Sequence, residues 1–182
     1  MDIYGQSPAE VREERPDGRQ VRKVGVAESA VSATGQTLRT SGVGSCLAIG
    51  LCDAEREIAG LGHPMLPRFA DHASPERGKF VDTTIDDLLD DLAEAGARPA
   101  TVDAVLVGGA QMFDFSFSDG DRESTRSVGP RNVETAEEHL RDRGVDLRAE
   151  RTGGSVGRSV KLDSATGELT VRTASERTTE VL

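Results

Sequence analysis

A cysteine that follows a glycine-rich turn is the residue of this chain best placed by its type and neighbours to do chemistry. The run Thr40-Ser-Gly-Val-Gly-Ser leads into Cys46, which stands at the head of an apolar segment. Glycines let a backbone turn sharply and bring its N–H groups close to a ligand, which is how an oxyanion hole forms beside a nucleophile. Cysteines are also common as inert packing residues. Cys46 is therefore a candidate nucleophile, with core packing as the alternative interpretation.

A histidine seventeen residues later supplies a candidate base. The segment that starts at Cys46 has the pattern of a strand, and Glu57–Leu61 that of its hairpin return. Because a hairpin brings its two ends together, His63 is expected to lie near Cys46. Its neighbours Gly62 and Pro64 favour a loop of fixed shape. A thiol next to a histidine is a pair that supports nucleophilic catalysis, whereas a lone histidine is more often structural.

The two cysteines of the chain, Cys46 and Cys52, are expected to be free thiols. The segment SCLAIGLCD alternates small residues and cysteines with leucine and isoleucine, as a strand does. Six strand residues at about 3.3 Å each separate the cysteines by roughly 20 Å, which is too far for a disulfide and disfavours a thiol redox sensor. A metal centre made of Cys46, Cys52, His63 and His72 would have irregular spacing, so no metal and no other cofactor are predicted.

The elements that must position these residues include two helices, predicted from apolar residues at helical spacing. The first lies within Gly78–Ala95 and stops at Gly96, with aspartates along a face that we interpret as solvated rather than as a metal site. The second is expected to be capped by Asn132 and to end at Gly144, with His139 on its surface.

Strands account for most of the remaining chain. Short strands with glycine turns are predicted between Val21 and Asp53, a buried central strand over Val102–Gly109, and three further strands within Val145–Thr173. Asp114–Thr125 is polar and acidic and is expected to be an exposed loop. The pattern predicts an α/β fold, in a single compact layered domain with mixed, largely antiparallel sheets and two main helices.

The length of 182 residues is that of one domain. Residues 1–20 are expected to form a flexible acidic and polar arm, residues 21–173 the folded domain, and residues 174–182 a short tail. Neither a membrane span nor the apolar core of a signal peptide is found, so we expect a cytoplasmic protein with no direct membrane insertion.

The charge is strongly negative, with 22 Lys+Arg against 32 Asp+Glu and a net charge of −10. Only three of the basic residues are lysines, namely Lys23, Lys79 and Lys161. An acidic chain repels polyanions, so nucleic acid is not expected as a partner. Because the acids are scattered, we interpret them as a surface adapted to high salt; acidic substrate mimicry and cation binding are weaker alternatives.

Five short motifs, taken in order, resemble the chemoreceptor glutamine deamidase family, CheD. They are Thr40-Ser-Gly-Val-Gly-Ser-Cys46, Gly62-His63-Pro64-Met65-Leu66-Pro67, Gly108-Gly109-Ala110-Gln111-Met112-Phe113, Gly129-Pro130-Arg131-Asn132 and Gly153-Gly154-Ser155-Val156-Gly157-Arg158. The resemblance extends from about Val21 to Arg172. It implies a fold similar to the catalytic domains of bacterial deamidating toxins.

The resemblance also implies a function and its residues. The family converts specific glutamines of methyl-accepting chemotaxis receptors to glutamate, as a cysteine-dependent protein-glutamine glutaminase that releases ammonia. Its nucleophile falls on Cys46, its histidine on His63 and its polar orienting residue on Thr40, and the N–H groups around Gly44 and Ser45 are candidates to bind the oxyanion and the substrate. The implied partners are the receptors and a CheC-type phosphatase of the response regulator. The alternative is a non-catalytic regulatory partner of that phosphatase.

Overall fold

Two mixed sheets form the frame of the molecule. The computed structural model describes residues 13–14, 18, 20–111, 127–173 and 179–182. In spatial order, the first sheet contains β1 (Glu13–Glu14), β2 (Gln20–Lys23), β4 (Thr37–Val43), β9 (Arg158–Asp163), β10 (Leu169–Thr173) and β11 (Thr179–Val181). The second contains β3 (Ser29–Ser32), β6 (Ile58–Gly62), β5 (Leu47–Asp53), β7 (Asp103–Gly108) and β8 (Asp146–Thr152). Neighbouring strands are antiparallel except for β2 with β4 and β7 with β8.

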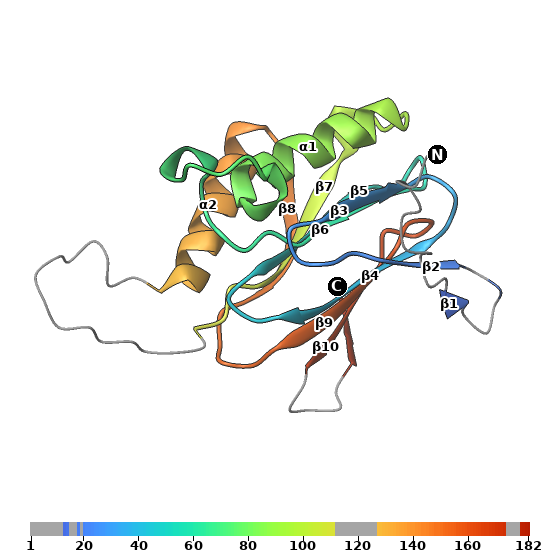
Figure 1. Cartoon of the computed structure of the whole chain (residues 1–182). Coiled ribbons are helices and arrows are strands. Elements are labelled where there is room, and N and C mark those ends of the chain that lie inside the picture. The colour runs from blue at the N-terminus through green and yellow to red at the C-terminus, as the bar shows by residue number, and fades with distance from the viewer. Residues whose placement is uncertain (1–12, 15–17, 19, 112–126, 174–178) are drawn as a thin grey trace, which may run out of the picture.

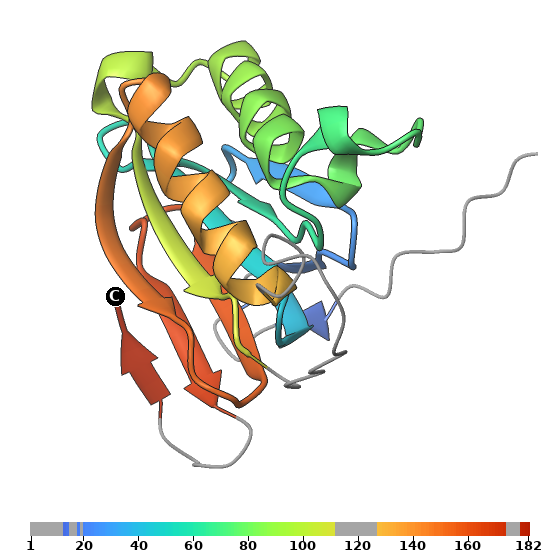
Figure 2. The same ribbon diagram turned by 90° about the vertical axis from the view of Figure 1, so that its left-hand side faces the viewer.

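Helices cover one face of the second sheet, and the first sheet covers the other (Figure 1). The helices are α1 (Val81–Glu94) and α2 (Val128–Asp142), and three short 3-10 turns, η1 (Phe69–Asp71), η2 (Arg77–Lys79) and η3 (Pro99–Thr101), lie in the connections. In the view turned by 90°, α2 runs along β7 and β8 (Figure 2). The predicted α/β fold with mixed, largely antiparallel sheets and two main helices is confirmed.

The middle strand β5 is buried on both faces, as its alternating sequence requires. Leu47, Ile49 and Leu51 pack into the core beneath the helices, whereas Ala48 and Cys52 pack into the core between the two sheets. Each large side chain that becomes fully buried contributes on the order of 2 kcal/mol. The two cores therefore fix β5, and with it the position of the turn that precedes it.

The predicted hairpin is present, with β6 returning antiparallel to β5. Ile49 lies opposite Gly62, so the start of β5 and the end of β6 meet at one end of the sheet. Gly62 allows α1 to approach closely, because a Cβ at this position would lie 2.5 Å from Thr84 Cγ2. A larger residue at position 62 would push the helix away from the strand end that carries His63.

The second helix differs from its predicted start, because Asn132 does not cap it. The helix begins at Val128, and Asn132 is a fully buried residue of its interior. Gly129 and Pro130 lie in the first turn, where proline is tolerated because the N–H that it lacks would have no partner within the helix. The prediction was wrong because a Gly-Pro pair resembles a turn. The predicted end is confirmed, since Gly144 follows with φ +69°.

His139 is also placed differently from the prediction. Its Nε2 lies 2.8 Å from Asp86 Oδ1 of α1, and Arg143 Nη2 lies 2.7 Å from the same oxygen. His139 is thus a half-buried link between the two helices rather than a surface residue.

The ends of the chain contribute to the first sheet. Thr179–Val181, part of the expected tail, forms β11 and pairs with β10. The expected loop Asp114–Thr125 and most of the expected arm 1–20 lie outside the described residues. Within the described ranges, neither α1 nor α2 has the length and apolar character needed to cross a membrane.

Candidate active site

The loop Gly44–Cys46, called the cysteine loop below, joins the two sheets and is held through three consecutive carbonyl groups. Ala110 N–H donates to Gly44 O and Gly109 N–H donates to Cys46 O, both at 2.8 Å. The carbonyl between them, that of Ser45, accepts a hydrogen bond of 2.9 Å from Asn132 Nδ2. The loop is therefore fixed on its carbonyl side by Gly109 and Ala110, which follow β7, and by α2.

The opposite side of this loop presents backbone N–H groups. In a trans peptide the C=O and the following N–H point in opposite directions, so the engaged carbonyls of Gly44 and Ser45 turn the N–H groups of Ser45 and Cys46 the other way. Among the described residues, no backbone carbonyl accepts a hydrogen bond from these two N–H groups. Two adjacent N–H donors beside a cysteine are an arrangement suited to binding an oxyanion.

The close approach of β7 to this loop depends on Gly108. Gly108 has φ +118°, and a Cβ here would lie 2.4 Å from Cys46 O. Only glycine combines this backbone conformation with so short a contact. The glycine pair Gly108-Gly109 at the end of the buried strand thus contacts the cysteine loop directly.

Cys46 itself is half-buried rather than fully enclosed. Burial raises the pKa of the Cys46 thiol above its ordinary value, and the hydrogen bond from its own backbone N–H lowers it in part. At neutral pH the resting thiol is protonated and needs a base to become a nucleophile.

His63 follows β6 directly and lies beside the cysteine loop, because Leu47 N–H donates to Pro64 O at 3.1 Å. The backbone of His63 is held on both sides, with its N–H donating to Glu28 O at 3.0 Å and its C=O accepting from Ala27 N–H at 2.9 Å. The segment therefore cannot drift away from the start of β5 without breaking several hydrogen bonds.

The imidazole of His63 is fully buried and bonded at one nitrogen. Its Nδ1 lies 2.6 Å from Thr40 Oγ1 of β4, which belongs to the other sheet. Its Nε2 is buried and has no hydrogen-bond partner among the described residues. Burial lowers the pKa of the imidazole, which favours the neutral form. When Nδ1 carries the proton and donates to Thr40 Oγ1, Nε2 holds the free lone pair of a base.

The other candidate residues lie apart from this cluster. Cys52 is at the far end of β5, where its sulfur is 4.0 Å from Gly167 O and burial raises its pKa to about 12. His72 is exposed, and its ring lies against that of Phe80 at 5.2 Å. Across the described ranges there is no group of three or more His, Cys, Asp and Glu side chains that could hold a metal ion.

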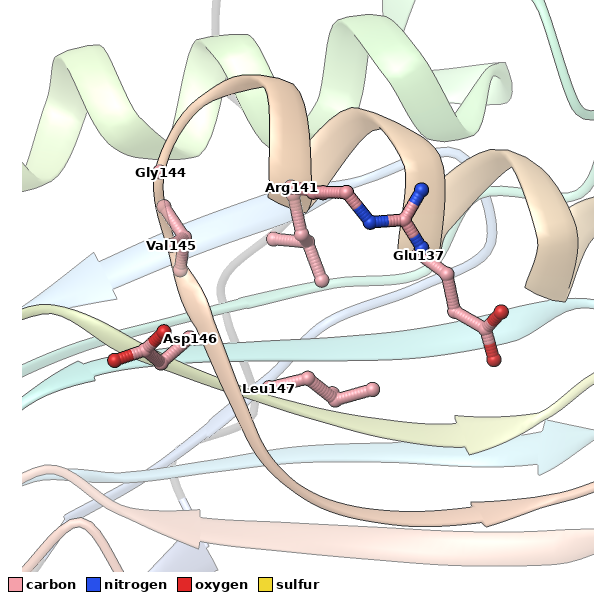
Figure 3. A pocket seen from close by; sticks show the side chains of 7 residues that line it. Glu137, Arg141, Gly144, Val145, Asp146 and Leu147 are labelled. Atoms are coloured by element: carbon pink, nitrogen blue, oxygen red, sulfur yellow. The ribbon is translucent and has the colours of Figure 1, made fainter.

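Two hollows lie along α2, at opposite ends of the second sheet. The one drawn in Figure 3 lies between the end of α2 and the start of β8, where Asp146 pairs with Asp103 at the Cys52 end. The other adjoins the cysteine loop, because Gly109 lines it together with residues of α2 and with Gly153. Its volume of about 470 Å³ provides a concave surface next to the candidate site.

Asn132 is the site residue that sequence reasoning assigned to another role. Its only signal in the sequence was that it belongs to the Gly129–Asn132 motif. The spacing of apolar residues after it predicted instead that Asn132 caps a helix. The structure shows that it bonds to the cysteine loop.

The site has the composition of proteins that use a cysteine nucleophile with a histidine base and a third group that orients the imidazole. The profile of the family described as CheD chemotactic sensory transduction matches residues 65–173.

Curated relatives extend the similarity over nearly the whole chain. A probable chemoreceptor glutamine deamidase CheD of Natronomonas pharaonis is 48% identical over 86% of this chain and 91% of its own. The protein of the same name from Haloarcula marismortui is 40% identical over 96% of both chains. The chemoreceptor glutamine deamidase CheD of Bacillus subtilis is 37% identical over 86% of this chain and 93% of its own. The chain belongs to the CheD family.

Proposed function

We propose that this protein is a cysteine-dependent protein-glutamine deamidase that converts glutamines of chemotaxis receptors to glutamate in the cytoplasm. Relatives across most of its length carry the name chemoreceptor glutamine deamidase. The observation that carries the proposal is the cysteine loop, whose three carbonyls are all engaged and whose Ser45 and Cys46 N–H groups donate to no carbonyl of the described residues. Such a loop is suited to an acyl-transfer reaction at a carboxamide.

The first half of the reaction uses His63 as a base. Its Nε2 accepts the Cys46 proton, and the thiolate attacks the carboxamide carbon of the substrate glutamine. The C–S bond forms while the carbonyl electrons move to oxygen, and the N–H groups of Ser45 and Cys46 bind that oxyanion. His63 then gives its proton to the leaving nitrogen, which departs as ammonia.

The second half hydrolyses the thioester. His63 takes a proton from water, the hydroxide attacks the acyl carbon, and Cys46 leaves and recovers its proton. The balance is one glutamine side chain and one water consumed, with one glutamate and one ammonia produced. Thr40 holds the imidazole in the tautomer that leaves Nε2 free, which explains why this hydroxyl lies 2.6 Å from Nδ1.

The test is conversion of a purified receptor fragment, followed by mass spectrometry of its glutamine-containing peptides. Cys46→Ala should abolish the conversion, because no nucleophile remains. Cys52→Ala is the matched control and should stay active, since the Cys52 thiol is buried at the far end of β5. Conversion that survives Cys46→Ala would overturn the mechanism.

A complex with a CheC-type phosphatase is proposed as a second interaction. An adaptor without chemistry has no need of a half-buried cysteine and a buried imidazole on adjoining segments, so the site favours an enzyme that also binds this partner. A pull-down with the phosphatase tests this, since Cys46→Ala should still bind while it no longer deamidates. A wild-type protein that binds the phosphatase but never modifies receptors would identify the regulatory role as the principal one.

A further inference from the structure

One side chain of α2 ties the two halves of the candidate active site together. Asn132 Nδ2 donates to Ser45 O at 2.9 Å and to Met65 O at 3.1 Å. The first carbonyl directly precedes Cys46, and the second lies two residues after His63. Asn132 is fully buried, so both hydrogens of its amide are committed to these bonds without competition from solvent.

The bond to Ser45 has a special consequence for the cysteine. The peptide unit between Ser45 and Cys46 is planar and trans, so the direction of its C=O sets the direction of its N–H. Holding Ser45 O on the α2 side aims the N–H of Cys46 at the opposite side of the loop. A substrate carbonyl attacked by the Cys46 sulfur would place its oxygen within reach of the same N–H.

The neighbouring carbonyls do not depend on a side chain in this way. Gly44 O and Cys46 O are held by the backbone N–H groups of Ala110 and Gly109, so neither bond uses a side chain. The carbonyl of Ser45 is bonded by a side chain instead. Asn132 is therefore the link in this loop that a substitution can remove while the backbone contacts remain.

We propose that Asn132 is a positioning residue for the reaction, which orients the oxyanion-binding N–H of Cys46. This inference rests on the proposed deamidase function and deepens it. Asn132 contacts no substrate atom and moves no proton; it fixes the peptide unit that stabilises the transition state.

The histidine side of the site should survive the loss of Asn132. His63 keeps its backbone bonds to Glu28 and Ala27, and the N–H of Met65 still donates to Lys79 O at 2.9 Å. The Thr40 hydroxyl still holds the ring. Removing Asn132 should therefore impair oxyanion binding far more than it impairs activation of the thiol.

Two reactions of the same thiol separate these effects. Deamidation passes through an oxyanion, whereas alkylation of Cys46 by iodoacetamide is a displacement at a saturated carbon that creates no oxyanion. The variants are Asn132→Ala and the smaller change Asn132→Ser, with Thr135→Val as the control, because Thr135 is buried on the same helix. Thermal unfolding of each variant reports whether it is folded at the assay temperature.

The expected result is a kcat for deamidation lower by about 10²-fold in Asn132→Ala, which is the usual loss for one oxyanion donor. KM and the alkylation rate should stay within about threefold of wild type, and Thr135→Val should match wild type in all three. Equal losses in deamidation and alkylation, an unchanged kcat, or failure of both Asn132 variants to fold would each overturn the positioning role.

The same data distinguish failure of this inference from failure of the proposed function. If the wild type deamidates and Cys46→Ala does not, the proposed function holds, and the Asn132 variants alone decide the inference. If the wild type shows no deamidation that depends on Cys46, the proposed function fails and the inference fails with it.

Discussion

Thr40 Oγ1 lies 2.6 Å from His63 Nδ1, although Thr40 belongs to the first sheet and His63 directly follows β6 of the second. Both side chains are buried, so the bond forms where water cannot compete for either partner. The contact couples the packing of the two sheets to the orientation of the imidazole. A shift of one sheet against the other would therefore change the orientation of the His63 ring.

Replacing Thr40 by valine should show how much this contact contributes to stability and to kcat. Thr40→Val keeps the side-chain volume but leaves His63 Nδ1 buried without a partner, which costs about 1–3 kcal/mol. We expect the free energy of unfolding to fall by about 2 kcal/mol and kcat to fall by about 10²-fold, because the base loses its fixed tautomer. Thr40→Ser keeps the hydroxyl and should retain most of the activity. Full activity in Thr40→Val would show that the orienting bond is unnecessary.

The pH dependence follows from the burial of both reacting groups. Burial raises the pKa of the Cys46 thiol and lowers that of the His63 imidazole, so the resting pair is neutral rather than ionic. Deamidation needs His63 unprotonated, and its acid limb in kcat/KM should have a midpoint below the ordinary histidine value of about 6.5.

Thiol alkylation provides the matching measurement. The rate for Cys46 should rise with pH and reach its plateau only above the ordinary thiol pKa of about 8.5. Cys52, whose pKa is raised to about 12, should stay unlabelled while the protein is folded. A plateau of Cys46 alkylation already present at pH 5 would instead indicate a preformed thiolate and imidazolium pair.

A pair of glycines tests how closely β7 must approach the cysteine loop. Gly108 and Gly144 both have positive φ, but a Cβ at 108 meets Cys46 O at 2.4 Å, whereas one at 144 meets nothing within 4 Å. Gly144→Ala should cost only the backbone strain of about 1 kcal/mol and stay active. Gly108→Ala should lose more stability and displace Cys46, with deamidation reduced at least tenfold. Equal behaviour of the two variants in denaturant unfolding and activity would contradict this account.

Salt should stabilise the protein because its net charge is −10. Cations screen the repulsion among the scattered carboxylates, so the free energy of unfolding should rise from low to molar KCl. Denaturant unfolding at a series of KCl concentrations measures this. Sucrose at matched osmolality is the control, because it does not screen charge. Full stability and activity without added salt would contradict the interpretation of the acidic surface.

Local patterns in the sequence were sufficient for the hairpin whose ends carry the candidate residues Cys46 and His63. Alternation of small and large residues after Cys46 identified β5, and Glu57–Leu61 was predicted as its return toward His63, as the pairing of β5 with β6 confirms. Both features depend on residues close together in the chain. The end of α1 and of α2 was predictable for the same reason, since glycines follow each helix with positive φ.

The amino-acid sequence by itself thus determined the strands, the helices and the nearness of the Cys46 and His63 segments. The tertiary structure decided how the site is completed. Thr40, which only the family resemblance had indicated, and Asn132 reach it through packing of one sheet on the other and of α2 on the second sheet. Periodicity reports which face of an element is buried, but it does not report what that face meets. For that reason Asn132 resembled a helix cap in the sequence, while in the folded chain it bonds across 87 residues to Ser45.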